Sequence, residues 1–162
     1  MTIRLATDAD FDALWPLLRA TFRAGDTYAV DPQISREAAF DYWMTQPAAT
    51  YVAEGPDGIA GTYYIRTNQP GGGAHICNCG YIVAEAARGQ GLAAQMCITS
   101  QQQAAALGYQ AMQFNFVLAS NAGAVRLWHR LGFDTVGTIP AAFNHPQAGM
   151  VDAFVMYKRL DG

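Results

Sequence analysis

The sequence predicts an α/β fold with a mixed sheet of about seven strands and four helices, in the order β-α-α-β-β-β-α-β-α-β-β. Three observations lead to this prediction. The chain has 162 residues, of which 51% are hydrophobic, so it can bury the core of a single domain spanning 1–162. Short apolar runs of strand length alternate with segments in which apolar residues recur every three or four positions. Clusters of glycine and proline separate these segments and supply the turns.

The N-terminal half is expected to hold three strands and two helices. In order, these are a strand at 2–6, helices at 9–24 and 35–46, and strands at 50–55 and 59–67. Asp8 and Ser35 are the expected N-caps, because a short polar side chain there accepts a hydrogen bond from the first helical turn. Pro16 lies inside the apolar stripe of the first helix and is expected to kink it.

The C-terminal half is expected to hold four strands and two helices. In order, these are a strand at 75–84, a helix that follows a glycine-rich turn and stops at Gly108, a strand at 110–117, a helix at 121–131, and strands at 134–140 and 150–158. The proline-rich segment that joins the last two strands is expected to be a loop.

Charge and hydropathy exclude several classes of function. The net charge is −3 and Lys158 is the one lysine, which argues against a nucleic-acid partner. No apolar run approaches the roughly 18 residues of a membrane span, so we expect no membrane partner. The first residues show no secretory signal, and we therefore expect a cytoplasmic location.

The three cysteines, Cys77, Cys79 and Cys97, are expected to be buried thiols. An odd number without a secretory signal argues against a disulfide framework. His75, Cys77 and Cys79 would share one face of a strand. No second cluster of zinc ligands is spaced to join them, so no metal site is predicted.

The strongest chemical signal is a glycine-rich turn between a strand and a helix, Arg88-Gly89-Gln90-Gly91-Leu92-Ala93. Glycines allow a ligand to approach the backbone, and the free N–H groups of the first helical turn favour an anion. A nucleoside triphosphate would require a G-x-x-x-x-G-K-[ST] string, which is absent. A dinucleotide would require an acidic residue about 20 positions further on, and residues 86–133 contain neither Asp nor Glu.

Coenzyme A remains as the ligand of this turn. Residues 86–133 carry a formal charge of +3, from Arg88, Arg126 and Arg130, while the rest of the chain carries −6. A basic patch in an acidic protein suits a small polyanion better than a duplex.

The turn resembles the acetyl-CoA motif R/Q-x-x-G-x-G/A of the GNAT superfamily of N-acetyltransferases, which Arg88, Gly91 and Ala93 match. A second segment of that family, Asn followed by a helix ending in Gly-Phe, resembles residues 121–133, and the element order is also that of the GNAT fold. The resemblance implies that acetyl-CoA is a co-substrate and that an amine attacks its thioester directly, in a ternary complex.

The same resemblance implies roles for individual residues. Backbone groups of Ile82 and Val83 would bind the pantetheine arm and polarise the acetyl carbonyl. The N–H groups of Arg88, Gly89, Gln90, Gly91, Leu92 and Ala93 would hold the pyrophosphate. Asn121 would bond the pantetheine arm, although a simple helix N-cap also explains an asparagine there.

Trp128 departs from the family pattern, which often places at this position a tyrosine that protonates the leaving thiolate. An indole N–H is a hydrogen-bond donor only and is not acidic enough for this task. Trp128 also lies on the apolar stripe of its helix, where core packing explains it. A catalytically silent acyl-CoA-binding domain is therefore one alternative function.

A second resemblance concerns the acceptor. The patterns N-x-P-G-x-x-A-H-x-C-N-x-G-Y, N-F-V-x-x-x-N and V-G-T-I-P-x-A are similar to those of the proline-analogue acetyltransferases of yeast, which act on L-azetidine-2-carboxylate. The functional asparagines of those enzymes match Asn78, Asn115 and Asn121. This resemblance implies that Asn78 and Asn115 are catalytic, whereas internal hydrogen bonds to the backbone are the alternative explanation.

The sequence leaves the general base and the acceptor open. Asp26, Glu54 and Asp152 are the candidate carboxylates, and a water relayed by asparagines is a fourth possibility. A small-molecule amine, an amino acid or a proline analogue is the expected acceptor, with a protein N-terminus or lysine as the alternative. A homodimer is compatible with the sequence.

Overall fold

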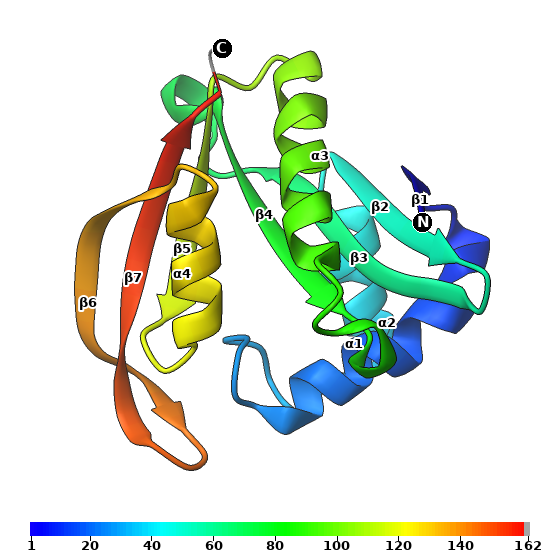
Figure 1. The fold of residues 1–162 in the computed structure, drawn as a ribbon, viewed down its shortest axis with the longest axis horizontal. Coiled ribbons are helices and arrows are strands. Elements are labelled where there is room, and N and C mark those ends of the chain that lie inside the picture. Colours follow the sequence, from blue (N-terminus) through cyan, green and yellow to red (C-terminus); the bar gives the residue numbers. More distant parts are fainter. Residues whose placement is uncertain (161–162) are drawn as a thin grey trace.

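The computed structural model describes residues 1–160 and confirms the predicted α/β architecture (Figure 1). One mixed sheet has the strand order β1-β2-β3-β4-β5-β7-β6. Its strands are β1 (Thr2–Leu5), β2 (Ala49–Gly55), β3 (Gly58–Thr67), β4 (Ile76–Val83), β5 (Ala111–Leu118), β6 (Asp134–His145) and β7 (Gly149–Arg159). The helices are α1 (Phe11–Ala24), α2 (Arg36–Phe40), α3 (Leu92–Ala106) and α4 (Ala122–Arg130).

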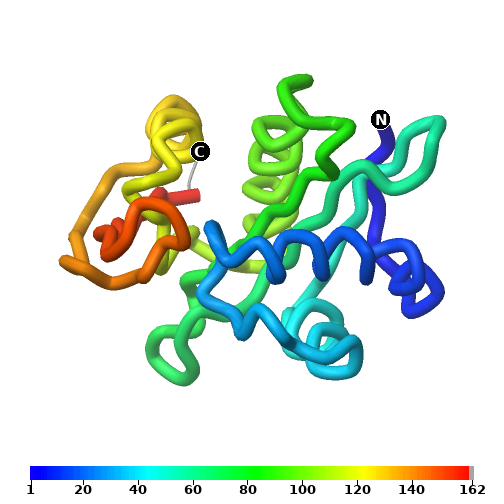
Figure 2. The backbone as a smooth tube through the Cα atoms, turned by 90° about the horizontal axis from the view of Figure 1, so that it is seen from below, coloured from blue at the N-terminus to red at the C-terminus, as the bar shows by residue number. Residues whose placement is uncertain are grey.

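The helices cover both faces of the sheet (Figures 1 and 2). Along β4 the side chains alternate between the two faces, as a strand requires. Ile82 packs in a core cluster with Leu14 and Leu18 of α1. Cys77 and Cys79 pack in a second cluster with Met96 and Cys97 of α3, where the apolar face of α4 also contributes. The α1–α2 layer and the α3–α4 layer therefore lie on opposite sides of β4.

The sheet splits between β4 and β5, the one parallel pair among the described strands. Only two pairs of residues connect these strands, Ile76 with Ala111 and Cys77 with Met112. Beyond Cys77 and Met112 the strands diverge. The edges of β4 and β5 that face one another there form no backbone ladder. Parallel strands that separate in this way leave backbone N–H and C=O groups available to a ligand.

The N-terminus of the first helix differs from the prediction. A 3₁₀ turn at Asp8–Asp10 precedes α1, and Thr7 rather than Asp8 comes directly before this turn. The Asp10 carboxylate accepts a hydrogen bond of 2.7 Å from the Thr7 backbone N–H. Asp10 therefore fixes the chain at this end, and α1 continues without interruption through Pro16.

The second predicted helix is divided. Ser35 is its N-cap, as predicted, because its hydroxyl accepts a hydrogen bond of 3.1 Å from the Ala38 N–H. After α2 the chain widens into a π-helical turn, η2, at Asp41–Thr45. This turn places Trp43 in the core, where its indole N–H donates to the Thr62 hydroxyl over 3.0 Å. The periodicity of apolar residues carries no signal for such a change in helix type.

The last two strands are longer than predicted, and the segment between them is a hairpin rather than a long loop. β6 continues to His145 and β7 begins at Gly149. The register shifts between Ile139 and Phe143, where Ala141 adopts a φ of 47°. The Asp152 carboxylate accepts a hydrogen bond from the Ala141 N–H over 2.9 Å and supports this irregularity. An edge strand such as β6 tolerates the proline that suggested a loop.

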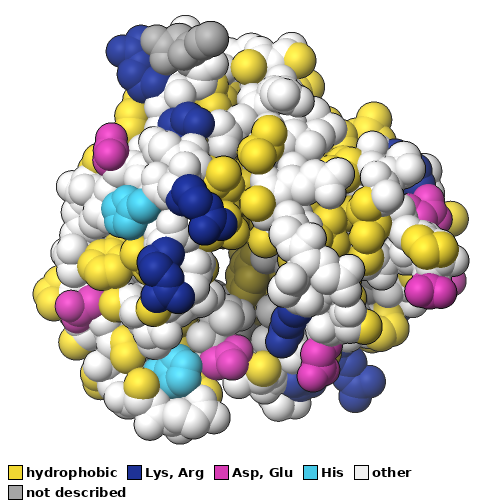
Figure 3. Space-filling view, in the orientation of Figure 1, with side chains coloured by type: hydrophobic (Ala, Val, Ile, Leu, Met, Phe, Trp, Pro, Cys, Tyr) yellow, Lys and Arg dark blue, Asp and Glu magenta, His cyan; other side chains and the backbone are white. Residues whose placement is uncertain are grey.

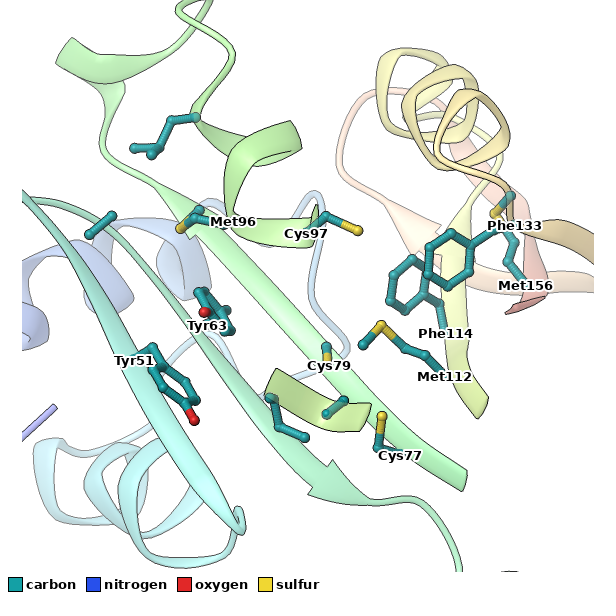
Figure 4. Packing of buried hydrophobic residues seen from close by; sticks show 14 of the residues in the cluster. Tyr51, Tyr63, Cys77, Cys79, Met96, Cys97, Met112, Phe114, Phe133 and Met156 are labelled. Carbon is teal, nitrogen blue, oxygen red and sulfur yellow. The ribbon is translucent and has the colours of Figure 1, made fainter. Parts of the chain in front are cut away.

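The described residues contain no helix that is long and apolar enough to cross a membrane. The three cysteines are free and buried in the α3-side core (Figure 4). Burial raises the pKa of the Cys79 and Cys97 thiols. His75 is exposed and precedes β4, and residues 1–160 contain no group of three metal-ligating side chains.

Candidate active site

A cavity of about 1070 Å³ occupies the split between β4 and β5. Figure 3 shows this hollow at the centre of the molecule, with Lys and Arg side chains beside it on the α4 side. On the α1–α2 side its walls include Asp26, Thr27, Tyr28, Tyr42, Tyr64 and Arg66, and on the α3–α4 side they include Arg88, Asn121, Ala124 and Trp128. The cavity therefore passes through the sheet from one face to the other.

The register of β4 decides which of its backbone groups face the split. The Ala84 N–H donates to the Ala60 oxygen, and the Asn68 N–H donates to the Ile76 oxygen. Because hydrogen-bonded pairs alternate along an antiparallel ladder, Ile82 exchanges its hydrogen bonds with Thr62 on β3. The prediction that Ile82 offers backbone groups to a ligand is therefore wrong, although its side chain lines the cavity.

The backbone groups that point into the split are those of Cys79, Tyr81 and Val83, which lie at non-hydrogen-bonded positions of the β3 ladder. The Val83 backbone thus faces the split, and so does that of Tyr81 in place of Ile82, while their binding of a ligand stays a prediction. The Tyr81 oxygen accepts a hydrogen bond of 3.0 Å from the Tyr28 hydroxyl, which lies in the loop after α1. Burial raises the pKa of Tyr28 well above its usual value, so this hydroxyl stays protonated and remains a donor.

Gly80 permits this contact between the α1–α2 loop and β4. A Cβ atom at Gly80 would lie 2.7 Å from the Tyr64 ring and 2.9 Å from the Tyr28 hydroxyl. Any other residue would therefore push both tyrosines away from the strand. The loop after α1 and the end of β6 both contribute to the cavity wall, the loop through Asp26, Thr27 and Tyr28 and the strand through His145.

Asn78 lies at the first position beyond the last β4–β5 pair. The residue is buried, with 9% of its surface exposed. Its Nδ2 atom donates to the Gln113 backbone oxygen over 2.9 Å, and its Oδ1 atom accepts from the Tyr64 hydroxyl over 3.2 Å. The internal hydrogen bond that was the alternative explanation for Asn78 is thus present. Each end of the amide keeps one further hydrogen-bonding position, and the side chain lines the cavity.

Asn115 belongs to a network of amides on the same side of the sheet. Its Nδ2 atom donates to Asn68 Oδ1 over 2.7 Å, and its Oδ1 atom accepts from Gln113 Nε2 over 2.9 Å. Asn115 is exposed, and it lines the cavity together with Asn68 and Asn78. The structure therefore brings Asn78 and Asn115 together on the cavity wall, where both contact Gln113.

The glycine-rich turn forms an open anion cradle at the start of α3. Gly89 and Gly91 have φ values of 73° and 79°, which favour glycine, and nothing lies within 4 Å of a Cβ atom at either position. The first turn of α3 has no side-chain cap and no acidic residue. The N–H groups of Leu92 and Ala93 thus lack helical partners, and Arg88 lines the cavity nearby. These features fit a pyrophosphate.

Asn121 and Trp128 lie on the α4 wall of the cavity. Asn121 is the N-cap of α4, because its Oδ1 atom accepts from the Ala124 N–H over 3.3 Å. The ring of Trp128 packs against Phe114 and Tyr81, with centroids 5.0 and 5.3 Å away. Core packing therefore accounts for the indole, as the sequence indicated.

The three candidate bases lie in different places. Asp26 lines the cavity on its α1–α2 side. Glu54 accepts a hydrogen bond of 3.0 Å from Arg4 at the β1–β2 end of the sheet. Asp152 supports Ala141 in the last hairpin. Of these three carboxylates only Asp26 lies at the cavity, where the sequence analysis overlooked a second acid, Glu85.

Solved structures with the same fold define the class of protein. A GCN5-related N-acetyltransferase from Kribbella flavida is 41% identical and has a TM-score of 0.92, with 98% of this chain and 96% of that chain covered. A GNAT superfamily phosphinothricin acetyltransferase from Sinorhizobium meliloti, solved in complex with AcCoA, shares the fold with a TM-score of 0.85 at 18% identity, with 98% of this chain and 87% of that chain covered.

The particular family follows from the sequence comparisons. The model of the acetyltransferase (GNAT) family matches residues 11–133. N-acetyltransferase aca1 of Schizosaccharomyces pombe is 31% identical over 148 residues, which cover 81% of this chain and 71% of the relative. The chain therefore belongs to the GNAT family and is an N-acetyltransferase. The fission-yeast relative is consistent with the resemblance to the yeast proline-analogue enzymes.

Several residues of the site were missed by sequence reasoning, namely Tyr64, Arg66 and Tyr81. Aromatic residues on buried strands look like core residues, and Tyr64 does belong to the core. Which backbone groups of β4 face the split depends on its pairing with β3, a property of the folded sheet. The one available signal was Arg66, the one charged residue of its strand.

Proposed function

We propose that this GNAT enzyme transfers the acetyl group of acetyl-CoA to the amine of a small molecule, with an amino acid or proline analogue as the expected acceptor. The observation that carries the proposal is the cavity through the split sheet, which has an anion cradle on one side and a polar, amide-lined wall on the other. Acetyl-CoA is the co-substrate, and its thioester supplies the acetyl group.

The cofactor side is assigned to residues around the split and the cradle. The N–H groups of the Arg88–Ala93 turn are suited to the pyrophosphate, because an anion is favoured at an uncapped helix N-terminus. The backbone of Val83 and Tyr81 offers hydrogen bonds to the pantetheine arm and to the acetyl oxygen. The Asn121 amide nitrogen, which the N-cap leaves free among the described residues, can add one more donor.

The acceptor side is assigned to the α1–α2 end of the cavity. Asn78 and Asn115 lie there, together with the carboxylate of Asp26. Neutral amides can orient a charged amine or carboxylate without strongly changing its protonation. Asp26, directly or through water, is the proposed acceptor of the proton that an amine must lose before it attacks. The amide and carboxylate groups on this wall favour a small polar amine as the acceptor.

The experiment that tests this function is a panel of amines assayed for free thiol released from acetyl-CoA. The panel contains proline analogues, amino acids, polyamines and short peptides. Release that depends on a small amine, with mass-spectrometric detection of its N-acetyl product, supports the proposal. Acetylation confined to peptides would replace the small-molecule acceptor by a protein acceptor. Tight acetyl-CoA binding without turnover on any amine would indicate a silent binding domain.

The cytoplasmic location, the single domain at 1–162 and the homodimer stay predictions from the sequence.

A further inference from the structure

Arg66 is a cation at the acceptor end of the cavity without a carboxylate partner among residues 1–160. The ion pairs of the described chain join Arg4 to Asp10 and Glu54, and Arg36 to Asp12. Arg66 takes part in none of them, although it lines the cavity. Its charge is therefore not neutralised by direct contact within the described protein.

Two aromatic rings hold the guanidinium group in place. Its Cζ atom lies 5.5 Å from the ring centroid of Tyr42 and 5.5 Å from that of Tyr64. Cation–π contacts of this kind stabilise the positive charge and leave the N–H groups at the edge of the guanidinium plane free to bond. The group is thus charged, oriented and only partly buried.

Most of the donors of Arg66 remain available. The guanidinium has five N–H donors, and one hydrogen bond uses Nη2, which donates to Gln46 Oε1 over 2.6 Å. Gln46 in turn donates to Asp41 Oδ2 over 2.6 Å. Arg66 is therefore linked to this carboxylate only through the neutral amide of Gln46. The fork of N–H groups that remains matches the geometry of a carboxylate.

The neighbours of Arg66 supply the rest of an amino-acid site. Arg66 lies opposite Asn78 in the β3–β4 register, on the side of the sheet covered by α1 and α2. The linked amides of Asn68 and Asn115 lie on the same cavity wall. A cation beside several neutral amides is suited to a ligand with a carboxylate next to its amine.

We infer that Arg66 binds the carboxylate of the acceptor, so that the enzyme selects amines that carry an adjacent carboxylate, that is, free amino acids including cyclic ones. This inference rests on the proposed function, because it assigns the specificity of the same site. It adds a charged contact to the neutral contacts of Asn78 and Asn115.

The test compares acceptors that differ only in the carboxylate. The pairs are L-azetidine-2-carboxylate with its carboxamide and L-alanine with L-alaninamide, each assayed for kcat/KM with saturating acetyl-CoA. The amide has the less basic amine, so unassisted chemistry favours the amide. We expect the wild-type protein to prefer the free acid by about 10- to 100-fold, as for a hydrogen bond to a charged group.

Arg66→Met is the informative variant. It should lower kcat/KM for the free acids by about 10- to 100-fold and change kcat/KM for the amides less than about threefold, with KM for acetyl-CoA unchanged. Arg66→Lys, which keeps the charge and loses the fork, should give an intermediate loss. Gln46→Ala is the matched control, because it breaks the contact between η2 and β3 and leaves the guanidinium charge in place. It should preserve the preference for the acid.

Two results would overturn the inference while the proposed function stands. One is equal use of acid and amide by the wild-type protein. The other is an equal loss on both acceptors in Arg66→Met and Gln46→Ala, which would make Arg66 a structural clamp. Circular dichroism and melting temperatures identify variants that fail to fold. If Arg66→Met does not fold, the preference of Arg66→Lys for the acid over the amide tests the inference instead. Acetylation of none of these amines, with activity on peptides alone, would reject the proposed function itself.

Discussion

The side chain of Asn78 spans the split sheet, because its Nδ2 atom donates a hydrogen bond of 2.9 Å to the backbone oxygen of Gln113. This bond lies one position beyond Cys77 and Met112, the last backbone pair between β4 and β5. A side-chain amide thus takes the place of the next ladder bond and marks the point where the strands begin to separate. Asn78 therefore contributes both to the shape of the cavity and to its wall.

Asn78→Ala should reduce both stability and activity. Loss of the amide leaves the Gln113 oxygen and the Tyr64 hydroxyl without their partner, which costs about 1–3 kcal/mol in the free energy of unfolding. We expect kcat/KM for the amine to fall about 10- to 100-fold while KM for acetyl-CoA changes little. Urea unfolding and steady-state kinetics measure the two effects. Asn144→Ala, at an exposed position of β6, is the control and should change neither.

Gly91→Glu should abolish acetyl-CoA binding. The substitution adds a side chain and a negative charge at the uncapped start of α3. The measurement is the rise in melting temperature with acetyl-CoA, because a ligand stabilises the state that it binds. Gly58→Glu is the matched control, since Gly58 also has a positive φ and an open surrounding but lies in the β2–β3 turn. An unchanged affinity in Gly91→Glu would contradict the cradle assignment.

Trp128→Phe should affect stability more than turnover. The indole packs against Phe114 and Tyr81, and aromatic contacts of this kind contribute about 0.5–1.5 kcal/mol beyond buried area. Because an indole does not protonate a thiolate, we expect kcat to stay within roughly tenfold of the wild-type value. Calorimetry and thiol-release kinetics test both statements. A collapse of kcat in a folded variant that binds acetyl-CoA normally would give Trp128 a chemical role.

Acid should remove the contribution of the Arg4–Asp10 pair. The hydrogen bonds from Arg4 lower the pKa of Asp10 to about 2, below the value of about 3.9 for an unfolded chain. A folded-state pKa that is lowered stabilises the fold above the unfolded pKa, and this stability is lost as the pH falls from about 4 towards 2. The difference in unfolding free energy between wild type and Asp10→Asn should therefore be largest near pH 6 and shrink below pH 4.

Urea titrations at pH 6, 4 and 2.5 measure this difference. Asp134→Asn, at an exposed position at the start of β6, is the control and should follow the wild type at every pH. A difference for Asp10→Asn that stays constant across this range would show that the carboxylate charge is not what stabilises the first turn.

The sequence was sufficient to predict the order of the elements and the position of the cradle, because hydrophobic periodicity and glycine placement are local properties. It was not sufficient to choose between Ile82 and Tyr81. The backbone groups of Ile82 face β3, whereas those of Tyr81 face the split. This difference depends on how the two residues pair with Thr62 and Tyr63 of β3. The β6–β7 hairpin could not be predicted either, because it also depends on a contact between distant residues. The Asp152 carboxylate supports the positive φ of Ala141 within β6.

The passage through the sheet has a kinetic consequence. Two molecules that enter a protein from opposite faces do not obstruct one another, so neither has to arrive first and neither has to leave first. Arg88 and Asn121 lie on one wall of this passage and Asp26 and Arg66 on the other. If the two sides bind as proposed, the acetylated product would leave on the α1–α2 side while free coenzyme A is still bound at the Arg88–Ala93 turn. The shape of the passage therefore imposes no order of binding or release. That order would depend on how tightly each wall binds its own ligand.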